Sequence, residues 1–204
     1  MQDPQKRLLL IFVKHPEKGK SKTRLAKGIG HEKALEVYRK LLAHTRDISL
    51  KLSADKAVFF GNQMPEKDLW TEAGLARYQQ VGEDLGARML HAFDWAFTQG
   101  YTQICIIGSD CANLTSDILD QAFQELYTHD FVIGPARDGG YYLLGMSALY
   151  PKVFENKVWS TSEVRKEAIA DLEEGDKSYA LLEMLSDVDV VEDLKGTFLE
   201  SYIP

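Results

Sequence analysis

The sequence has little cysteine, no long hydrophobic run and no excess of positive charge. Its 204 residues include two cysteines, Cys105 and Cys111, which do not form a CxxC pair and so indicate neither a zinc site nor a disulfide framework. The apolar run 8–13 is too short to span a membrane, and no signal-peptide cleavage site follows it. We therefore expect a cytoplasmic protein with no membrane span.

The charge balance argues against one class of partner. A formal net charge of -7 disfavours general binding to nucleic acid. Positive charge is nevertheless concentrated in the segment 14–27, where six basic residues are opposed only by Glu17. A local basic loop on an acidic protein suits a small anionic ligand better than a long polyanion.

Composition and length predict one folded domain over 1–204. Hydrophobic residues make up 45% and charged residues 27%, which are ordinary values for a globular protein with a sizeable core. The chain shows no internal repeat, low-complexity tract or linker. These features leave no sequence signal for a second domain.

Short apolar runs alternate with amphipathic stretches over the first two thirds of the chain. The runs predict strands at 7–13, 56–60, 77–81, 103–107, 131–134 and 141–145. Helices are predicted at 32–52, 65–73 and 84–99, from Ser116, and from Thr161 or Ser162 to about 172. The segment 14–30 is predicted to be mostly loop, and 187–199 the end of a strand followed by a short helix. This alternation predicts a three-layer α/β/α fold with a mostly parallel mixed sheet, to which the last third adds an antiparallel strand.

Charged side chains follow several of the predicted strands. They are Lys14, Lys22 and Arg24 after 7–13, Asp110 after 103–107, Asp138 after 131–134, and Asp187 and Asp189 near the C-terminus. Because open α/β sheets bind ligands beyond the carboxyl ends of their strands, we expect these groups to share one edge. Carboxylates hold divalent cations, and Lys and Arg hold phosphate oxygens. The pattern therefore predicts a site for a metal–diphosphate.

Each of these signals also has a plainer structural explanation. Lysine-rich loops are usually solvated surface, Asp110 could form an Asx turn or cap a helix, and Asp138 precedes a glycine in a turn signal. The basic loop lacks the upstream glycine of a Walker A motif. No GxSxG or HExxH motif is present, and Cys111 has no base nearby in sequence, so we interpret it as a small packed residue.

Several motifs taken together resemble a known family. They are Lys14-x-Pro16-x-x-Gly19 with Lys22-Thr23-Arg24-Leu25, Gln80-x-Gly82-x-Asp84-Leu85-Gly86-x-Arg88-Met89, Gly108-Ser109-Asp110-Cys111, the segment 134–145, Trp159-Ser160-Thr161, and Asp187-Val188-Asp189. On these motifs nearly the whole chain resembles the glycosyltransferase-like family DUF2064, within the nucleotide-diphospho-sugar transferase superfamily of GT-A-like fold. More distantly, it is similar to small nucleotidyltransferases such as the molybdenum-cofactor guanylyltransferase and phospholactate guanylyltransferase.

The resemblance implies a metal-dependent transferase that uses Mg²⁺ or Mn²⁺ and acts on a nucleotide or nucleotide sugar. It implies that Asp110 is a metal ligand and catalytic carboxylate, with Asp189 or Asp187 as the second ligand. It also implies that Lys14, Lys22 and Arg24 face the phosphates, and that the segment with Gly82, Asp84 and Arg88 lies along the nucleoside. Asp138 would touch the sugar or acceptor, and is our candidate for orienting or deprotonating the acceptor.

Two departures from the family pattern leave the type of reaction open. Ala112 stands where family members usually have proline, and Asp110 is flanked by Ser109 and Cys111, so that no DxD motif is formed. Glycosyl transfer to a small-molecule acceptor is favoured on the resemblance alone. Nucleotidyl transfer with release of pyrophosphate is one alternative, and a nucleotide-binding protein without catalysis is another.

Overall fold

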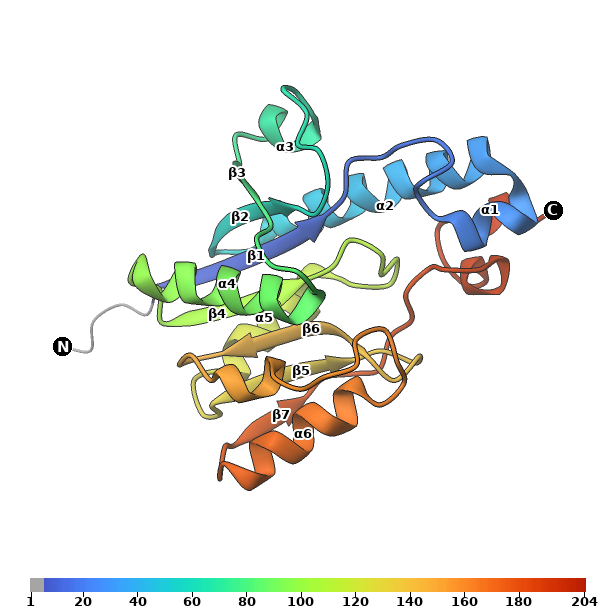
Figure 1. Cartoon of the computed structure of the whole chain (residues 1–204). Coiled ribbons are helices and arrows are strands. Elements are labelled where there is room, and N and C mark those ends of the chain that lie inside the picture. The colour runs from blue at the N-terminus through green and yellow to red at the C-terminus, as the bar shows by residue number, and fades with distance from the viewer. Residues whose placement is uncertain (1–5) are drawn as a thin grey trace.

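A mixed β-sheet forms the centre of the computed structural model, which describes residues 6–204 (Figure 1). Within that range the sheet has seven strands in the order β3-β2-β1-β4-β6-β5-β7. The strands are β1 (Arg7–Val13), β2 (Asp55–Phe60), β3 (Ala76–Gln79), β4 (Gln103–Ile107), β5 (Phe131–Pro135), β6 (Tyr141–Met146) and β7 (Tyr179–Leu181). Strand β6 runs antiparallel to β4 and β5, while the other pairs are parallel, as the sequence predicted.

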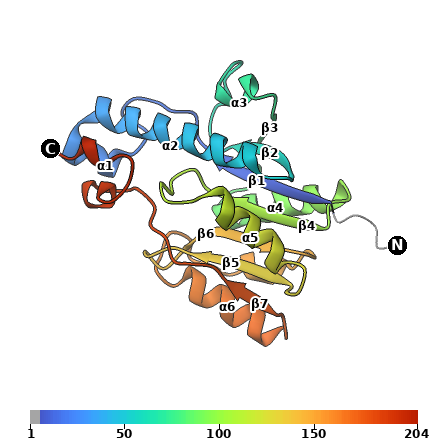
Figure 2. The same ribbon diagram turned by 180° about the vertical axis from the view of Figure 1, so that it is seen from behind.

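Helices cover both faces of this sheet, which makes three layers. They are α1 (Thr23–Ile29), α2 (His31–Lys51), α3 (Leu69–Glu72), α4 (Leu85–Thr98), α5 (Ser116–Glu125) and α6 (Val164–Glu174), with short 3₁₀ helices at Pro151–Phe154, Val191–Leu194 and Glu200–Tyr202. Figures 1 and 2 show the two faces, with α4 and α6 on one and α2 and α5 on the other. Among the described residues, no helix combines the length and the hydropathy needed to cross a membrane.

The alternation of side chains along β1 explains why both faces are apolar. Leu9 and Ile11 pack in the cluster that includes α2 and α5, whereas Leu8 and Leu10 pack in the cluster that includes α4 and α6. Successive residues of a strand point to opposite faces, so a continuous apolar run is needed where both are covered. A third cluster joins α1, the start of α2 and the C-terminal segment through residues such as Leu25 and Val188.

Several predicted elements begin or end elsewhere than expected. The segment 14–30, predicted to be mostly loop, contains helix α1, which begins at Thr23 after Lys22 adopts left-handed backbone angles (φ 49°). The helix predicted at 65–73 is shortened to α3 because the Asp68 carboxylate accepts hydrogen bonds from the backbone N–H groups of Trp70 and Thr71 and so fixes its start. Helix α5 is capped by Thr115, so that Ser116 is its first residue rather than its cap.

The remaining differences concern the C-terminal third. Neither Thr161 nor Ser162 caps α6, since the residue before the helix is Glu163, which makes no side-chain cap. No strand ends at Asp187. The strand of this region is β7, which pairs with β5 over only three residues and carried no alternating pattern to predict it.

Candidate functional site

A cavity of about 650 Å³ opens at the carboxyl ends of β1 and β4. The strand order changes direction between these two strands, because β2 and β3 lie on one side of β1 and β4 lies on the other. Ligands of open α/β sheets bind in the crevice that such a reversal creates. The cavity is lined by the loop after β1, the start of α4, the loop after β4 and the start of β6. Ser160, Asp187 and Asp189 complete the lining.

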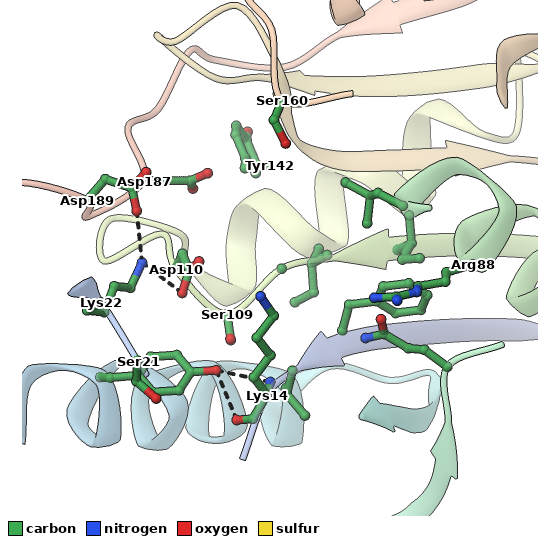
Figure 3. A pocket seen from close by; sticks show the side chains of 18 of the residues that line it. Lys14, Ser21, Lys22, Arg88, Ser109, Asp110, Tyr142, Ser160, Asp187 and Asp189 are labelled. Atoms are coloured by element: carbon green, nitrogen blue, oxygen red, sulfur yellow. Dashed lines mark hydrogen bonds and ion pairs between the residues drawn. The ribbon is translucent and has the colours of Figure 1, made fainter. Parts of the chain in front are cut away.

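Lys22 stands at the centre of the charged part of the cavity (Figure 3). Its ammonium lies 3.0 Å from Asp110 Oδ1 and 3.2 Å from Asp189 Oδ1, and its side chain is only 6% exposed. Burial alone would lower the pKa of Lys22, but the charges of Asp110 and Asp189 outweigh burial and raise the pKa above its usual value. Lys22 is therefore a permanent cation held between two carboxylates.

Asp110 and Asp189 meet although they are far apart in sequence. The backbone N–H of Val188 donates to the carbonyl of Asp110 at 2.9 Å, which ties the C-terminal segment to the loop after β4. The Asp193 carboxylate then accepts the backbone N–H of Asp189 at 2.8 Å and fixes the start of the following turn. The expected convergence of these acidic residues at one edge is therefore present in the structure.

Asp187 adds a third carboxyl group to this cluster. Burial raises the pKa of Asp187 to about 7, and the negative charge of Asp110 adds to the shift. We call Asp110, Asp187 and Asp189 the acidic wall of the cavity, and Lys14, Lys22 and Arg24 its basic wall. Two of the three carboxylates, Asp110 and Asp189, contact the buried ammonium of Lys22, and Arg24 Nη1 lies 3.1 Å from Asp189 Oδ2 at the rim.

The chemistry of the acidic wall suits a divalent cation. Within residues 6–204, no group of three His, Cys, Asp or Glu side chains is already arranged around a common point for a metal ion. Carboxylate oxygens are nevertheless the ligands that Mg²⁺ and Mn²⁺ prefer. Two carboxylates, Asp110 and Asp189, share the single ammonium of Lys22, so this ammonium does not neutralise both of them.

Lys14 differs from Lys22 in having an ammonium that is free to meet a ligand. Its backbone is fixed, since the Tyr38 hydroxyl donates to the Lys14 carbonyl and accepts the Lys14 N–H, both at 3.0 Å. Its side chain extends into the cavity (Figure 3) and forms no ion pair within the described part of the chain. Lys14 is thus placed to bind an anion, whereas Lys22 and Arg24 already contact carboxylates.

The segment 82–88 forms the opposite end of the cavity. Gly82 has a φ of 141°, and a Cβ there would lie 2.7 Å from the backbone of Ala87, so only glycine lets the chain fold onto the start of α4. Asp84 caps that helix by accepting the N–H of Ala87 at 2.8 Å. Arg88 lines the cavity and donates from Nε to the Gly82 carbonyl at 3.0 Å. Gly82 and Asp84 therefore shape this end, and Arg88 faces the ligand space.

Asp138 lies outside the residues that line the cavity. It is exposed in the turn between β5 and β6, where its Oδ1 accepts the N–H of Gly140 at 2.9 Å. Its charge still reaches the acidic wall, because it contributes to the raised pKa of Asp187. The structure thus gives Asp138 the turn geometry expected from its sequence context, and its contact with an acceptor remains a prediction.

Sequence reasoning gave no role to several residues that line the cavity. These are Ser21, Tyr38, Gln80, Tyr142 and Ser160. Three of them, Gln80, Tyr142 and Ser160, lie in motifs that carried the family resemblance, and that membership was the available signal. Cys111 was interpreted as a packed residue, and it is buried, with the pKa of its thiol raised by burial to about 12.

Comparison with known proteins supports the fold. The sequence profile of DUF2064, described as uncharacterized proteins conserved in bacteria, matches residues 41–161. A solved structure from Desulfovibrio desulfuricans G20, provisionally named a nucleotide-diphospho-sugar transferase, is 28% identical with a TM-score of 0.88 over 97% of this chain and 94% of that one. No curated protein matches the sequence.

Two more distant structures share the fold. A CMP:2-keto-3-deoxy-manno-octonic acid synthetase complexed with CTP is 11% identical, with a TM-score of 0.58 over 94% of this chain and 96% of that chain. A glucosyl-3-phosphoglycerate synthase from Mycobacterium tuberculosis, in complex with Mn²⁺, UDP and glucosyl-3-phosphoglycerate, is 10% identical, with a TM-score of 0.55 over 90% and 71%. The predicted fold of nucleotide-diphospho-sugar transferases is confirmed.

Proposed function

This chain belongs to the bacterial family DUF2064, and from that premise we propose that it is a metal-dependent transferase acting on a nucleotide-activated substrate. One observation carries the proposal. The acidic wall and the basic wall line the same cavity at the carboxyl edge of the sheet and meet where Lys22 Nζ lies 3.0 Å from Asp110. A metal–diphosphate needs both kinds of group at one place.

The residues of the two walls have different roles in this proposal. Asp110, Asp189 and Asp187 would hold Mg²⁺ or Mn²⁺, whose chemistry is to neutralise the oxygens of the diphosphate. The free ammonium of Lys14 binds phosphate oxygens and stabilises the charge that develops on the leaving diphosphate. Lys22, fixed beside Asp110 and Asp189, neutralises part of their charge before a ligand enters.

The other end of the cavity suits a nucleoside. Leu85 and Met89 supply apolar surface, and Gln80 and Arg88 supply polar groups beside it. Apolar walls with a few placed polar groups are typical of small-molecule sites. A nucleotide lying along the cavity would thus place its base near Arg88 and its phosphates near Lys14.

Glycosyl transfer from a nucleotide sugar is the reaction we propose, with Asp138 orienting a small-molecule acceptor at the edge of the acidic wall. Its support is the family and the 28% identical structure named for nucleotide-diphospho-sugar transfer. Nucleotidyl transfer from a nucleoside triphosphate is the second candidate. The absence of a DxD motif at Asp110 and the likeness to a synthetase bound to CTP favour it.

A thermal-shift panel of nucleoside diphosphates, nucleotide sugars and triphosphates, each with and without Mn²⁺, tests this function. Ligand at a hundredfold excess over its dissociation constant stabilises a protein by about 2.7 kcal/mol. We expect a nucleotide sugar with Mn²⁺ to give the largest shift, whereas a larger shift with a triphosphate would favour nucleotidyl transfer.

Replacing Asp110 tests the centre of the proposal. Asp110→Ala should abolish the Mn²⁺-dependent part of nucleotide binding while the protein stays folded. Asp94→Ala is a suitable control, because Asp94 is an exposed carboxylate in the middle of α4. If Asp110→Ala binds nucleotide and Mn²⁺ as the unmodified protein does, the proposed function is wrong.

A further inference from the structure

The motif Trp159-Ser160-Thr161 has no part in the chemistry described so far, yet it reaches the cavity. Ser160 lines the cavity, and its backbone has a φ of 65°. A non-glycine residue in this left-handed region is uncommon, and such residues cluster at ligand sites, where the surrounding structure holds them in place. The position of Ser160 therefore points to a ligand-binding role.

The loop that carries Ser160 is anchored to two helices. The indole of Trp159 packs so closely on Gly86 of α4 that a Cβ at Gly86 would lie 2.3 Å from it. The ammonium of Lys157 pairs with the Asp171 carboxylate of α6, and the two side chains are only 6% and 17% exposed. Both contacts are shielded from solvent, so they hold the loop firmly.

The same loop also contacts the turn between β5 and β6. Gly139 has a φ of 94°, and a Cβ there would lie 2.1 Å from the carbonyl oxygen of Ser162. The N–H of Arg165 donates to the Gly139 carbonyl at 3.1 Å. Ser160 is therefore presented by a loop that is fixed on three sides.

The Ser160 hydroxyl is available to a ligand. It forms no hydrogen bond with another residue in the range 6–204, and the residue is exposed at the cavity. Figure 3 shows Ser160 and Tyr142 on the same side of the cavity, with Lys14 and Ser21 on the opposite side. The Tyr142 hydroxyl already donates to the carbonyl of Glu183 at 3.0 Å.

We propose that Ser160 is a specificity-determining residue that hydrogen-bonds a hydroxyl of a polyol group, namely the transferred sugar or the acceptor. This inference rests on the proposed function. A serine hydroxyl is both donor and acceptor without charge, which matches another hydroxyl better than a phosphate. Lys14, which would bind the phosphates, lies on the opposite side of the cavity from Ser160. A sugar or acceptor that extends from the phosphates toward the Ser160 side would therefore contact this serine.

Calorimetric titration of Ser160→Ala tests the assignment in two arms, both with Mn²⁺. The first compares UDP, GDP, CDP and ADP with their glucose conjugates. The second titrates glucose into the complex with the best-binding nucleoside diphosphate. We expect unchanged affinity for the nucleoside diphosphate and about a three- to tenfold loss in one arm, as for one lost hydrogen bond. Loss in the first arm assigns the hydroxyl to the donor sugar, and loss in the second assigns it to the acceptor.

Two further variants separate the hydroxyl from the backbone. Ser160→Gly removes both the hydroxyl and the left-handed strain and should lose affinity as Ser160→Ala does, whereas Ser160→Asn keeps polar groups and should recover part of it. Asn156→Ala is the matched control, since Asn156 lies in the same loop with a φ of 54° but does not line the cavity. If nucleotides bind and neither arm changes in Ser160→Ala, this inference alone is wrong. If the unmodified protein binds no nucleotide, the proposed function falls and this inference falls with it.

Discussion

The basic wall of the cavity comes from one short stretch of chain, 14–24, whereas the acidic wall is assembled from the loops that follow β4 and β7. The basic wall needs only the local course of one loop. The acidic wall depends on a long-range hydrogen bond between Val188 and Asp110 and on the turn between β5 and β6. Substitutions in the supports of the acidic wall should therefore lower stability most. Substitutions in the basic wall should lower it only where the side chain also contacts the acidic wall, as Lys22 does.

Gly139→Ala should have the largest effect on stability, because it breaks the support of the acidic wall. A methyl group there meets backbone atoms of Ser162, and the φ of 94° disfavours any side chain. The turn also holds the chain that leads to Asp187, through the Arg137 N–H and the Leu185 carbonyl at 3.0 Å. We expect a loss of about 3 kcal/mol in the free energy of unfolding, measured by urea denaturation.

A second glycine provides the control for this substitution. Gly74 has a φ of 71°, and a Cβ there would meet no other atom. Gly74→Ala should therefore cost only the backbone strain, about 1 kcal/mol. Equal losses for the two variants would show that the contact between the turn and Ser162 does not matter.

Lys22→Met should have the next largest effect, because it removes the buried cation of the basic wall that contacts Asp110 and Asp189. Asp110 then loses its counter-charge and Asp189 keeps only Arg24, but both carboxylates are partly exposed, so we expect a loss of about 2 kcal/mol rather than the full cost of a buried pair. Mn²⁺ should restore the melting temperature of this variant more than it raises that of the unmodified protein.

Lys20→Met is the control for Lys22→Met, because it removes the same charge from the same loop at an exposed position. The Lys20 side chain is 76% exposed and pairs with Glu17 at 2.7 Å. Such a surface pair contributes about 0.5 kcal/mol at most, and Mn²⁺ should not rescue it. A Lys22→Met variant that behaves like Lys20→Met would contradict the central position that we give to Lys22.

The titration of Asp187 should make the stability of the protein depend on pH. The pKa of Asp187 is about 3.9 in an unfolded chain and is raised to about 7 in the folded protein. Burial is the main cause of this rise. The folded state then binds the proton more tightly, so the free energy of unfolding falls as pH rises from about 4 to about 7. The slope is at most about 1.4 kcal/mol per pH unit.

Asp187→Asn isolates this contribution from other titrating groups. Both proteins are denatured in EDTA across this pH range. The free energy of unfolding of the unmodified protein, minus that of Asp187→Asn, should fall as pH rises from about 4 to about 7. A difference that is constant between pH 4 and pH 7 would show that Asp187 is not held protonated by burial.

Arg24→Ala should have the smallest effect, because it removes only an exposed part of the basic wall. Arg24 is 68% exposed and pairs with Asp189 at 3.1 Å. We expect a loss of about 0.5 kcal/mol, which added salt should reduce further. A loss as large as that of Lys22→Met would mean that the rim is as important as the buried pair.

Much of the fold could be predicted because β1, β4 and β5 are short apolar runs and α2 and α4 carry clear helical stripes. The basic wall could be predicted for a related reason, since its charges are adjacent in sequence. By contrast, β7 escaped prediction because a strand of three residues at the edge of a sheet needs no periodic pattern.

The acidic wall was predicted as a set of residues but not as a geometry. Sequence order suggested that Asp110 and Asp189 share an edge, yet nothing in the sequence showed that Lys22 would lie between them. Ser160 and Tyr142 were not predicted as site residues, because an uncharged hydroxyl does not stand out in a sequence. Their positions depend on tertiary contacts such as that of Trp159 with Gly86. Side chains placed by packing are the part that a single sequence does not reveal.

The reversed direction of β6 has a mechanical consequence for the cavity. Because β6 starts where β5 ends, the 136–140 hairpin connects two hydrogen-bonded strands. The 14–22 segment, in contrast, leads from β1 into α1 with sheet pairing at one end only. Side-chain contacts hold that segment instead, since the Tyr38 hydroxyl bonds the backbone of Lys14 and Lys22 pairs with Asp110 and Asp189.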